Sequence, residues 1–293
     1  MKKYFLLPVF ILAAWSAFAI NQDRQMRKTD KAKACFTKVY ELDPSNPVAI
    51  KELANLYYSY RQFAKAIEFA SKCKNYENAE RIIAMSSYQL EDYTAAIPVF
   101  QRILAKNPND IEITYAMARA YLDMEEYSKS IPLYQKAIQL DPTKNLWMYE
   151  LGLIYYNGNN FKNALAMFLK AEDNGYPQTS DFNENLGYAY IYAGDFDRGE
   201  KLLLAIIAQK PGNKNMLRDM AEAYYTRKMY DKSLEFCQKL MEMDTQDAKA
   251  LYQAGLCFQK KGDKNKGEKM CDKAINIDPS LQNLRQQRMQ AGL

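Results

Sequence analysis

The chain has 293 residues, of which 48% are hydrophobic and 26% are charged, and this balance is typical of a folded protein rather than a disordered one. Its net charge is only +5, and basic and acidic residues alternate over residues 218–239 instead of forming a basic stripe, so we predict no nucleic-acid partner. The absence of histidine excludes serine and cysteine catalysis through histidine, as well as histidine metal sites. We therefore predict no enzymatic activity, no cofactor, no metal and no small-molecule substrate.

The N-terminus has the features of a secretory signal peptide. Lys2 and Lys3 precede an apolar run over residues 4–18, and small residues stand at Ala17 and Ala19. We predict a signal peptide over 1–19, with cleavage near Ala19 and export to the periplasm or the exterior of a bacterial cell. The apolar run is shorter than the roughly 20 residues of a spanning helix. The alternatives are a retained anchor, which leaves a peripheral position at a membrane open, and the first helix of the fold.

Residues 20–46 are predicted to form a polar segment followed by a single helix over 31–42. A regular repeat begins at residue 47, shortly after Pro44. The single helix would cover the exposed apolar side of the first repeat, as a capping element does in a repeat array.

A repeat of about 34 residues is marked by two series of small residues. Successive members of each series lie 30 to 35 residues apart, and the second series follows the first by 12 residues throughout. Only small residues let two helices cross at close range, so each unit is predicted to be a pair of antiparallel helices. The first series is Ala54, Ala84, Ala118, Gly152, Gly187, Ala221 and Gly255, and the second is Ala66, Ala96, Ser130, Ala164, Gly199, Ser233 and Gly267.

Aromatic residues and prolines occupy fixed places around these small residues. An aromatic residue stands three places before the second series in six of seven units, and most units close with a proline that ends the second helix. Pro98 and Pro132 are exceptions, since they fall within the second helices. We expect them near the start of those helices, where a missing N–H costs little.

The clearest unit, LWMYELGLIYYNGNNFKNALAMFLKA, resembles the tetratricopeptide repeat. Its matching residues are Trp147, Leu151, Gly152, Tyr155, Ala164, Phe168 and Ala171. The resemblance implies an all-α, right-handed superhelical solenoid of antiparallel helix pairs. We predict seven units and a C-terminal capping helix over 282–293. The units are 47–76, 77–110, 111–144, 145–179, 180–213, 214–247 and 248–281.

In this family the first helices line a concave groove, so the resemblance also implies which residues face it. Tyrosine and arginine are enriched at protein interfaces, because each combines a large buried area with a polar end. The alternative is that the tyrosines pack against neighbouring helices. The predicted groove residues are Tyr115, Arg119, Tyr149, Leu153, Tyr156, Glu184, Tyr188, Tyr192, Arg218 and Tyr225.

Some members of the family hold a C-terminal carboxylate with a set of lysine, asparagine and arginine side chains. Lys51 and Asn55 match the first pair, but Ile82, Glu112 and Ala116 occupy the other places. We therefore predict no such carboxylate clamp.

The chain contains five cysteines, an odd number for a protein that is expected to be exported. Cys237 and Cys271 occupy equivalent places in neighbouring units, so helix spacing would keep them about 9–10 Å apart, too far for a disulfide. A disulfide that involves Cys257 stays open. The alternative is that the thiols are small apolar residues in helix packing.

The pattern as a whole predicts an exported scaffold that binds other proteins or peptides through its groove, in the assembly or organisation of the bacterial cell envelope. The identity of the partner is not written in the sequence. The alternative is a self-associating structural spacer, in which the ends of the array stack into an oligomer.

Overall fold

The computed structural model describes residues 29–74, 76–209 and 212–290, and the predicted signal peptide lies outside them. The described residues form α-helices and turns without a strand, which confirms the predicted all-α class. Within them no helix is both long enough and apolar enough to cross a membrane. Residues 29–42 are helical, and the following helices are α2 (Pro47–Ser59), α3 (Phe63–Lys72), α4 (Ala79–Gln89), α5 (Tyr93–Lys106), α6 (Ile111–Asp123), α7 (Tyr127–Leu140), α8 (Asn145–Asn157), α9 (Phe161–Asp173), α10 (Ser180–Ala193), α11 (Phe196–Gln209), α12 (Lys214–Thr226), α13 (Tyr230–Met243), α14 (Ala248–Lys260), α15 (Lys264–Ile277) and α16 (Leu281–Gln290).

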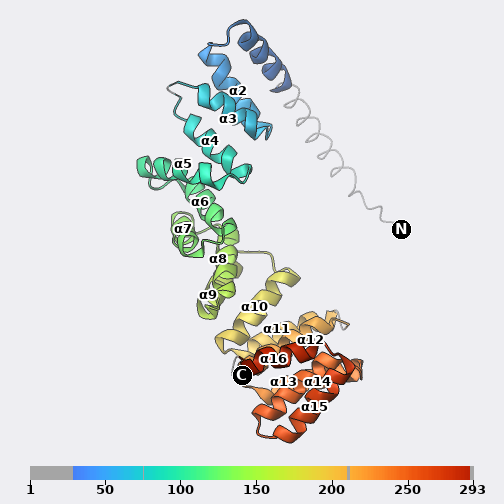
Figure 1. The fold of residues 1–293 in the computed structure, drawn as a ribbon. Helices are drawn as coiled ribbons and strands as arrows, with labels where there is room; N and C mark the ends of the chain where they lie inside the picture. Colours follow the sequence, from blue (N-terminus) through green and yellow to red (C-terminus); the bar gives the residue numbers. More distant parts are fainter. Residues whose placement is uncertain (1–28, 75, 210–211, 291–293) are drawn as a thin grey trace, which may run out of the picture. The chain divides into compact units, whose positions relative to one another are not determined.

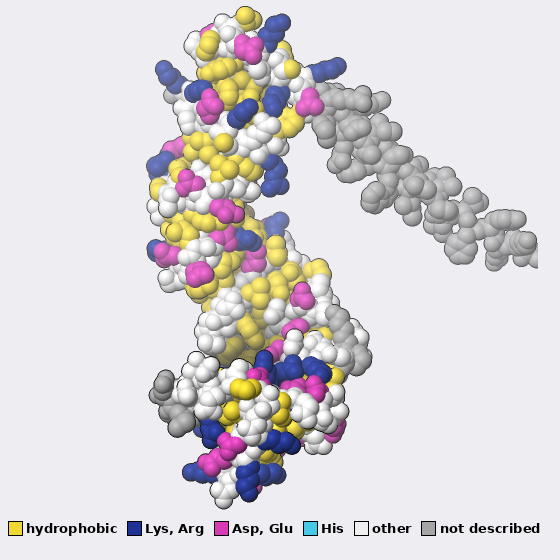
Figure 2. Space-filling view, turned by 45° about the vertical axis from the view of Figure 1, so that its right-hand side comes forward, with side chains coloured by type: hydrophobic (Ala, Val, Ile, Leu, Met, Phe, Trp, Pro, Cys, Tyr) yellow, Lys and Arg dark blue, Asp and Glu magenta, His cyan; other side chains and the backbone are white. Residues whose placement is uncertain are grey.

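The chain divides into two compact units, Met1–Pro142 and Thr143–Leu293. Within each unit, consecutive helices pack as hairpins from α2 with α3 onward (Figure 1), and each second helix of the pairs α2–α3, α4–α5, α8–α9 and α12–α13 also packs on the next first helix. On the face drawn in Figure 2, basic and acidic side chains are interspersed over the helices, with apolar surface between them.

The two helices of a pair cross where the small residues stand. Ser130 Oγ donates to Ala118 O at 2.9 Å, and Ser233 Oγ donates to Ala221 O at 2.7 Å, each from one helix to the other. A hydroxyl on a single methylene can span this gap only because the backbones are in close contact. All four of these residues are buried.

The turn inside each helix pair places one residue in the left-handed region. At the turn after α6, for example, the amide of Glu125 donates to Leu122 O at 2.9 Å and that of Glu126 to Tyr121 O at 2.8 Å. These bonds satisfy the last carbonyls of the first helix, and they require a positive φ that favours glycine. The seven equivalent residues, with φ from 56° to 102°, are Arg61, Glu91, Glu125, Asn159, Gly194, Lys228 and Gly262.

Glu125→Gly is expected to stabilise the first unit by about 0.5–1 kcal/mol, because glycine adopts this conformation without the steric cost of a β-carbon. Urea unfolding followed by circular dichroism measures the change. Glu126→Gly is the matched control, since Glu126 has a φ of −84° and gains nothing from glycine. An equal gain at both positions would show that the left-handed conformation is not the cause.

Two prolines lie deeper in their helices than expected. Pro98 and Pro132 are each the sixth residue of α5 and α7, and both helices continue through them. At the sixth residue an N–H would normally donate to the carbonyl four places earlier, so each proline removes one helical hydrogen bond. The expectation that these prolines cost little is therefore wrong.

Extra helices cover the two ends of the array. Phe36 and Tyr40, on the helix over residues 29–42, pack on the core of α2 and α3, where the Tyr40 and Phe69 rings lie 5.0 Å apart. At the other end α16 begins at Leu281, which is buried against Ala248 and Tyr252.

The cysteines of the second unit behave as packing residues. Cys257, the one for which a disulfide was left open, forms no disulfide among the described residues, and its thiol donates to Ser233 Oγ at 3.2 Å. Burial raises the pKa of the Cys237 thiol to about 12, which keeps it protonated at neutral pH.

Candidate protein-binding face

The predicted groove residues lie on first helices in both units. Tyr115 and Arg119 are half-buried on α6 of the first unit, where the Tyr115 ring lies 5.9 Å from that of Tyr134. The other eight lie on α8, α10 and α12 of the second unit. There α10 packs beside α12, and α12 beside α14. We call the surface formed by α8, α10, α12 and α14 the first-helix face.

Tyr188 is part of the hydrophobic core rather than of the surface. Only 7% of it is exposed, and it packs with Leu217 and Met220 in the cluster around α12. Its hydroxyl donates to Met216 O at 3.4 Å, and burial raises its pKa above the usual value. Tyr188 therefore connects α10 to α12, which is the packing role left open as the alternative for the predicted groove tyrosines, and a role in partner binding stays a prediction.

Tyr149 also serves mainly in packing. Its ring stacks on Tyr176 with centroids 4.5 Å apart and lies 5.5 Å from Phe182. Asn185 Nδ2 donates to the Tyr149 hydroxyl at 2.9 Å. The half-buried Tyr149 thus fastens the long turn before α10 onto the helices around it.

Arg218 is occupied by an ion pair between consecutive helix pairs. Arg218 Nη2 lies 2.7 Å from the carboxylate of Asp247, whose side chain is 3% exposed. Asp247 also caps α14 by accepting from Ala250 N at 3.0 Å. The first unit repeats this arrangement, since Arg81 pairs with Asp110, the cap of α6.

The Arg81–Asp110 pair makes stability depend on pH. Burial acts to raise the pKa of the Asp110 carboxyl, but hydrogen bonds from Arg81 and from the backbone of Ile113 outweigh it, so the pKa lies below its usual value. A carboxyl whose pKa is lowered on folding contributes stability above its unfolded pKa, near 3.9, and loses that contribution as the pH falls through the folded value.

Asp110→Asn is therefore expected to lower the melting temperature of the protein at pH 6, and this difference should shrink as the pH falls below about 4. Thermal unfolding of both proteins across this range, followed by circular dichroism, measures the difference. Arg81→Gln in the wild-type protein, which keeps Asp110, should remove most of the pH dependence that Asp110 contributes. A constant difference down to pH 3 would rule out the linkage.

Tyr156 and Tyr192 remain partly exposed and form an aromatic cluster with Phe161. Phe161 stacks on Tyr192 with centroids 4.5 Å apart, and Tyr156 lies 5.4 Å from Phe161. The cluster lines an open pocket of about 520 Å³ together with Thr226 and Arg227, at the end of α12. The predicted groove residues include Tyr156 and Tyr192 but not Phe161, Thr226 or Arg227.

Carboxylates lie close to the tyrosines of this face. The pKa of Tyr192 is raised by burial first, and then by the negative charges of Glu222 and Asp219. Asp219 itself has a raised pKa because of burial, and in the described structure it makes no ion pair within 4.0 Å. The first-helix face thus combines aromatic surface with negative charge.

Comparison with known families agrees with this architecture. Three family models, each described as a tetratricopeptide repeat, match residues 115–177, residues 87–131 with 190–256, and residues 24–46 with 248–281. The chain is a tetratricopeptide repeat protein. No curated protein matches it.

The chain is similar to several solved protein structures. A tetratricopeptide repeat protein from Parabacteroides merdae has a TM-score of 0.50 and 15% identity, over 79% of this chain and 93% of that chain. MamA AMB-1 has a TM-score of 0.52 and 14% identity, over 58% of this chain and 94% of that chain. YrrB, described as a TPR protein with an unusual peptide-binding site, has a TM-score of 0.44 and 24% identity, over 61% of this chain and 92% of that chain.

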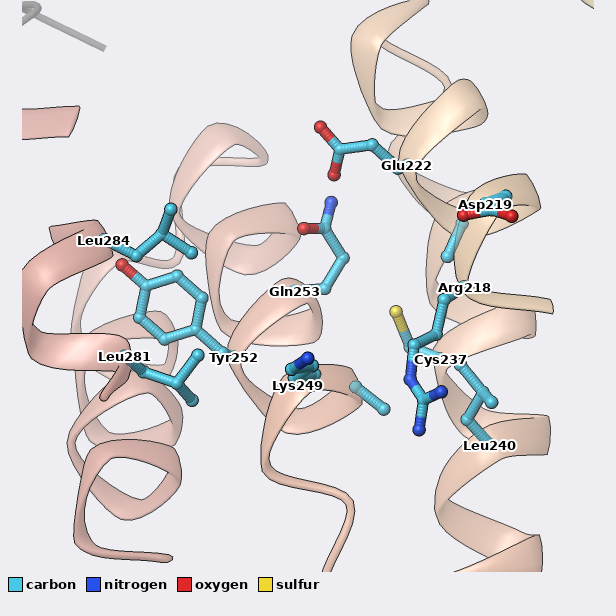
Figure 3. Close-up of a pocket in the computed structure, with 12 residues that line it drawn as sticks. Arg218, Asp219, Glu222, Cys237, Leu240, Lys249, Tyr252, Gln253, Leu281 and Leu284 are labelled. Atoms are coloured by element: carbon cyan, nitrogen blue, oxygen red, sulfur yellow. The ribbon is translucent and has the colours of Figure 1, made fainter. Parts of the chain in front are cut away.

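A second pocket lies between the last tetratricopeptide units and the C-terminal helix. It has a volume of about 240 Å³ and is lined by residues of α12, α13, α14 and α16 (Figure 3). Its apolar wall includes Leu240, Tyr252, Leu281 and Leu284. The sequence contains no signal for the two leucines of α16, because that helix was predicted only as a C-terminal cap.

Proposed function

We propose that this tetratricopeptide repeat protein is a scaffold that binds segments of other proteins against the first-helix face of its second unit. The observation that carries the proposal is the cluster of Tyr156, Phe161 and Tyr192, which is half-buried beside an open pocket. Partly exposed aromatic side chains are the groups that most often dominate binding energy in protein interfaces, because they bury a large area at little cost in conformational entropy.

We also propose that the mature chain acts outside the cytoplasm, in the organisation of a bacterial envelope. Support comes from the order of basic, apolar and small residues that precedes Ala19. A scaffold needs no catalytic group, which agrees with a chain that lacks histidine.

Tyr192→Ala is expected to lower the yield of crosslinked partner at least about tenfold, as for a central interface residue. The test crosslinks the mature protein in its native envelope and quantifies the captured proteins. Tyr127→Ala is the matched control, because Tyr127 is 43% exposed but lies on α7 in the first unit.

Equal partner yields from both variants would reject the first-helix face as the binding surface. Sedimentation of the mature protein adds a second criterion. A stable homo-oligomer that dissociates in Tyr192→Ala, with no other protein captured, would instead establish the self-associating spacer.

A further inference from the structure

The pocket between α12, α14 and α16 contains two nitrogen atoms that lack hydrogen-bond partners. Gln253 Nε2 and Arg218 Nε are both buried, and neither meets an acceptor among the described residues. The other two guanidinium nitrogens of Arg218 donate to Asn215 and Asp247, whereas Nε donates to no acceptor. A buried donor without an acceptor costs free energy, and an acceptor that enters this pocket recovers it.

The pocket also separates charge. Figure 3 shows Asp219 and Glu222 toward one end, Arg218 and Lys249 toward the other, and Gln253 between them. A carboxylate that spans the pocket would be repelled at its acidic end, and an ammonium group would be repelled at its basic end. A peptide group fits both ends, because its carbonyl accepts hydrogen bonds on one side and its N–H donates on the other.

The size and lining of the pocket select the side chain. A volume of about 240 Å³ is below the range of roughly 300–1,000 Å³ for drug-sized ligands, and it suits a single large apolar side chain. Leu240, Leu281 and Leu284 supply the apolar wall, and Leu284 is 40% exposed, so the wall reaches the surface.

We propose that this pocket anchors one apolar side chain from an internal segment of a partner protein, and that Gln253 and Arg218 donate to main-chain carbonyl oxygens of that segment. The inference rests on the proposed function and names the chemistry of the partner. Gln253 lies on α14, the first helix of the last unit, and the C-terminal helix supplies part of the wall. The last repeat is thereby a binding element as well as an end cap.

N-acetyl-leucinamide is the first probe, because it carries one apolar side chain and two carbonyl groups. Titration of the mature protein, with methyl-labelled leucines followed by NMR, should shift Leu240, Leu281 and Leu284 with millimolar affinity. N-acetyl-glycinamide lacks the side chain, 4-methylpentanoate carries a carboxylate, and isoamylamine carries an amine. Each is expected to bind at least about fivefold more weakly, because it lacks either the apolar side chain or the neutral amide groups.

Gln253→Leu keeps the size of the side chain and removes the donor, so it should weaken N-acetyl-leucinamide about fivefold. Gln282→Leu is the matched control on the exposed side of α16 and should bind as the wild type does. Leu284→Trp fills the pocket from its exposed edge and should abolish binding, whereas Gln286→Trp should not. Melting temperatures confirm that all four variants are folded.

Several results would overturn the proposal. Equal affinity for 4-methylpentanoate would make the pocket a carboxylate site, and unchanged affinity in Gln253→Leu would remove the role of the amide. An absence of shifts at the three leucines would show that water alone fills the pocket. Partner capture in the envelope tests the proposed function separately. Capture that is lost in Tyr192→Ala but unchanged in Gln253→Leu and Leu284→Trp would leave the scaffold standing and reject only the anchor pocket.

Discussion

Asp247→Ala is expected to lower the free energy of unfolding of the last two helix pairs by about 3 kcal/mol, since two interactions disappear together. The carboxylate caps α14 through Ala250 N, and it pairs with Arg218 from the preceding first helix. Its side chain is almost fully buried, so its removal leaves the guanidinium without its charge partner in a half-buried setting.

The measurement is urea unfolding, together with hydrogen exchange of α12 and α14, since repeat arrays can unfold locally. Asp263→Ala is the matched control, because Asp263 caps α15 from an exposed position, and its loss should cost only about 1 kcal/mol. Asp247→Asn keeps an oxygen for the cap, so its loss in the free energy of unfolding should lie between those of Asp247→Ala and Asp263→Ala. Equal losses for Asp247→Ala and Asp263→Ala would mean that the pair with Arg218 contributes nothing.

Gly267→Ala is expected to destabilise the last helix pair by about 2 kcal/mol, even though alanine is the better helix former. A β-carbon at this position would lie 2.5 Å from Gly255 O and 2.9 Å from Gln259 N. Both atoms belong to the backbone of α14, so a rotamer change cannot relieve the overlap, and the two helices must separate.

Gly212→Ala is the control for this substitution, because nothing lies within 4 Å of the added carbon and its φ is not left-handed. Thermal unfolding of the two variants gives the comparison. A rise in stability for Gly267→Ala would show that α14 and α15 do not approach each other as closely as the structure has them.

The fold could be predicted from the sequence because its period is a local property. Close packing of two helices demands a small residue at each crossing, and the interval between crossings is printed directly in the chain. The left-handed turn residues were missed, since Arg61 and Glu125 carry no glycine signal. Their conformation follows from the hydrogen bonds that end the first helix.

The candidate site could be predicted only in part. Tyr188 and Tyr192 lie one helical turn apart on α10, and the spacing of the sequence gives both to the same face. Packing on α12 buries Tyr188 and leaves Tyr192 beside a pocket. The difference in burial between Tyr188 and Tyr192 depends on the next repeat, so the sequence of α10 alone does not predict it. Contact between the groove residues and a partner stays a prediction that capture of partners would test.

The residue at the fifth place of a unit often reaches the following turn or helix. Lys51 lies over the Tyr76 ring, Arg81 pairs with Asp110, Tyr149 stacks on Tyr176, and Arg218 pairs with Asp247. A mutation at such a position destabilises the packing between repeats. Few substitutions that favour a new partner are therefore tolerated there. Binding specificity can instead evolve at positions such as Tyr156 and Tyr192, because substitutions there keep the contacts between consecutive repeats.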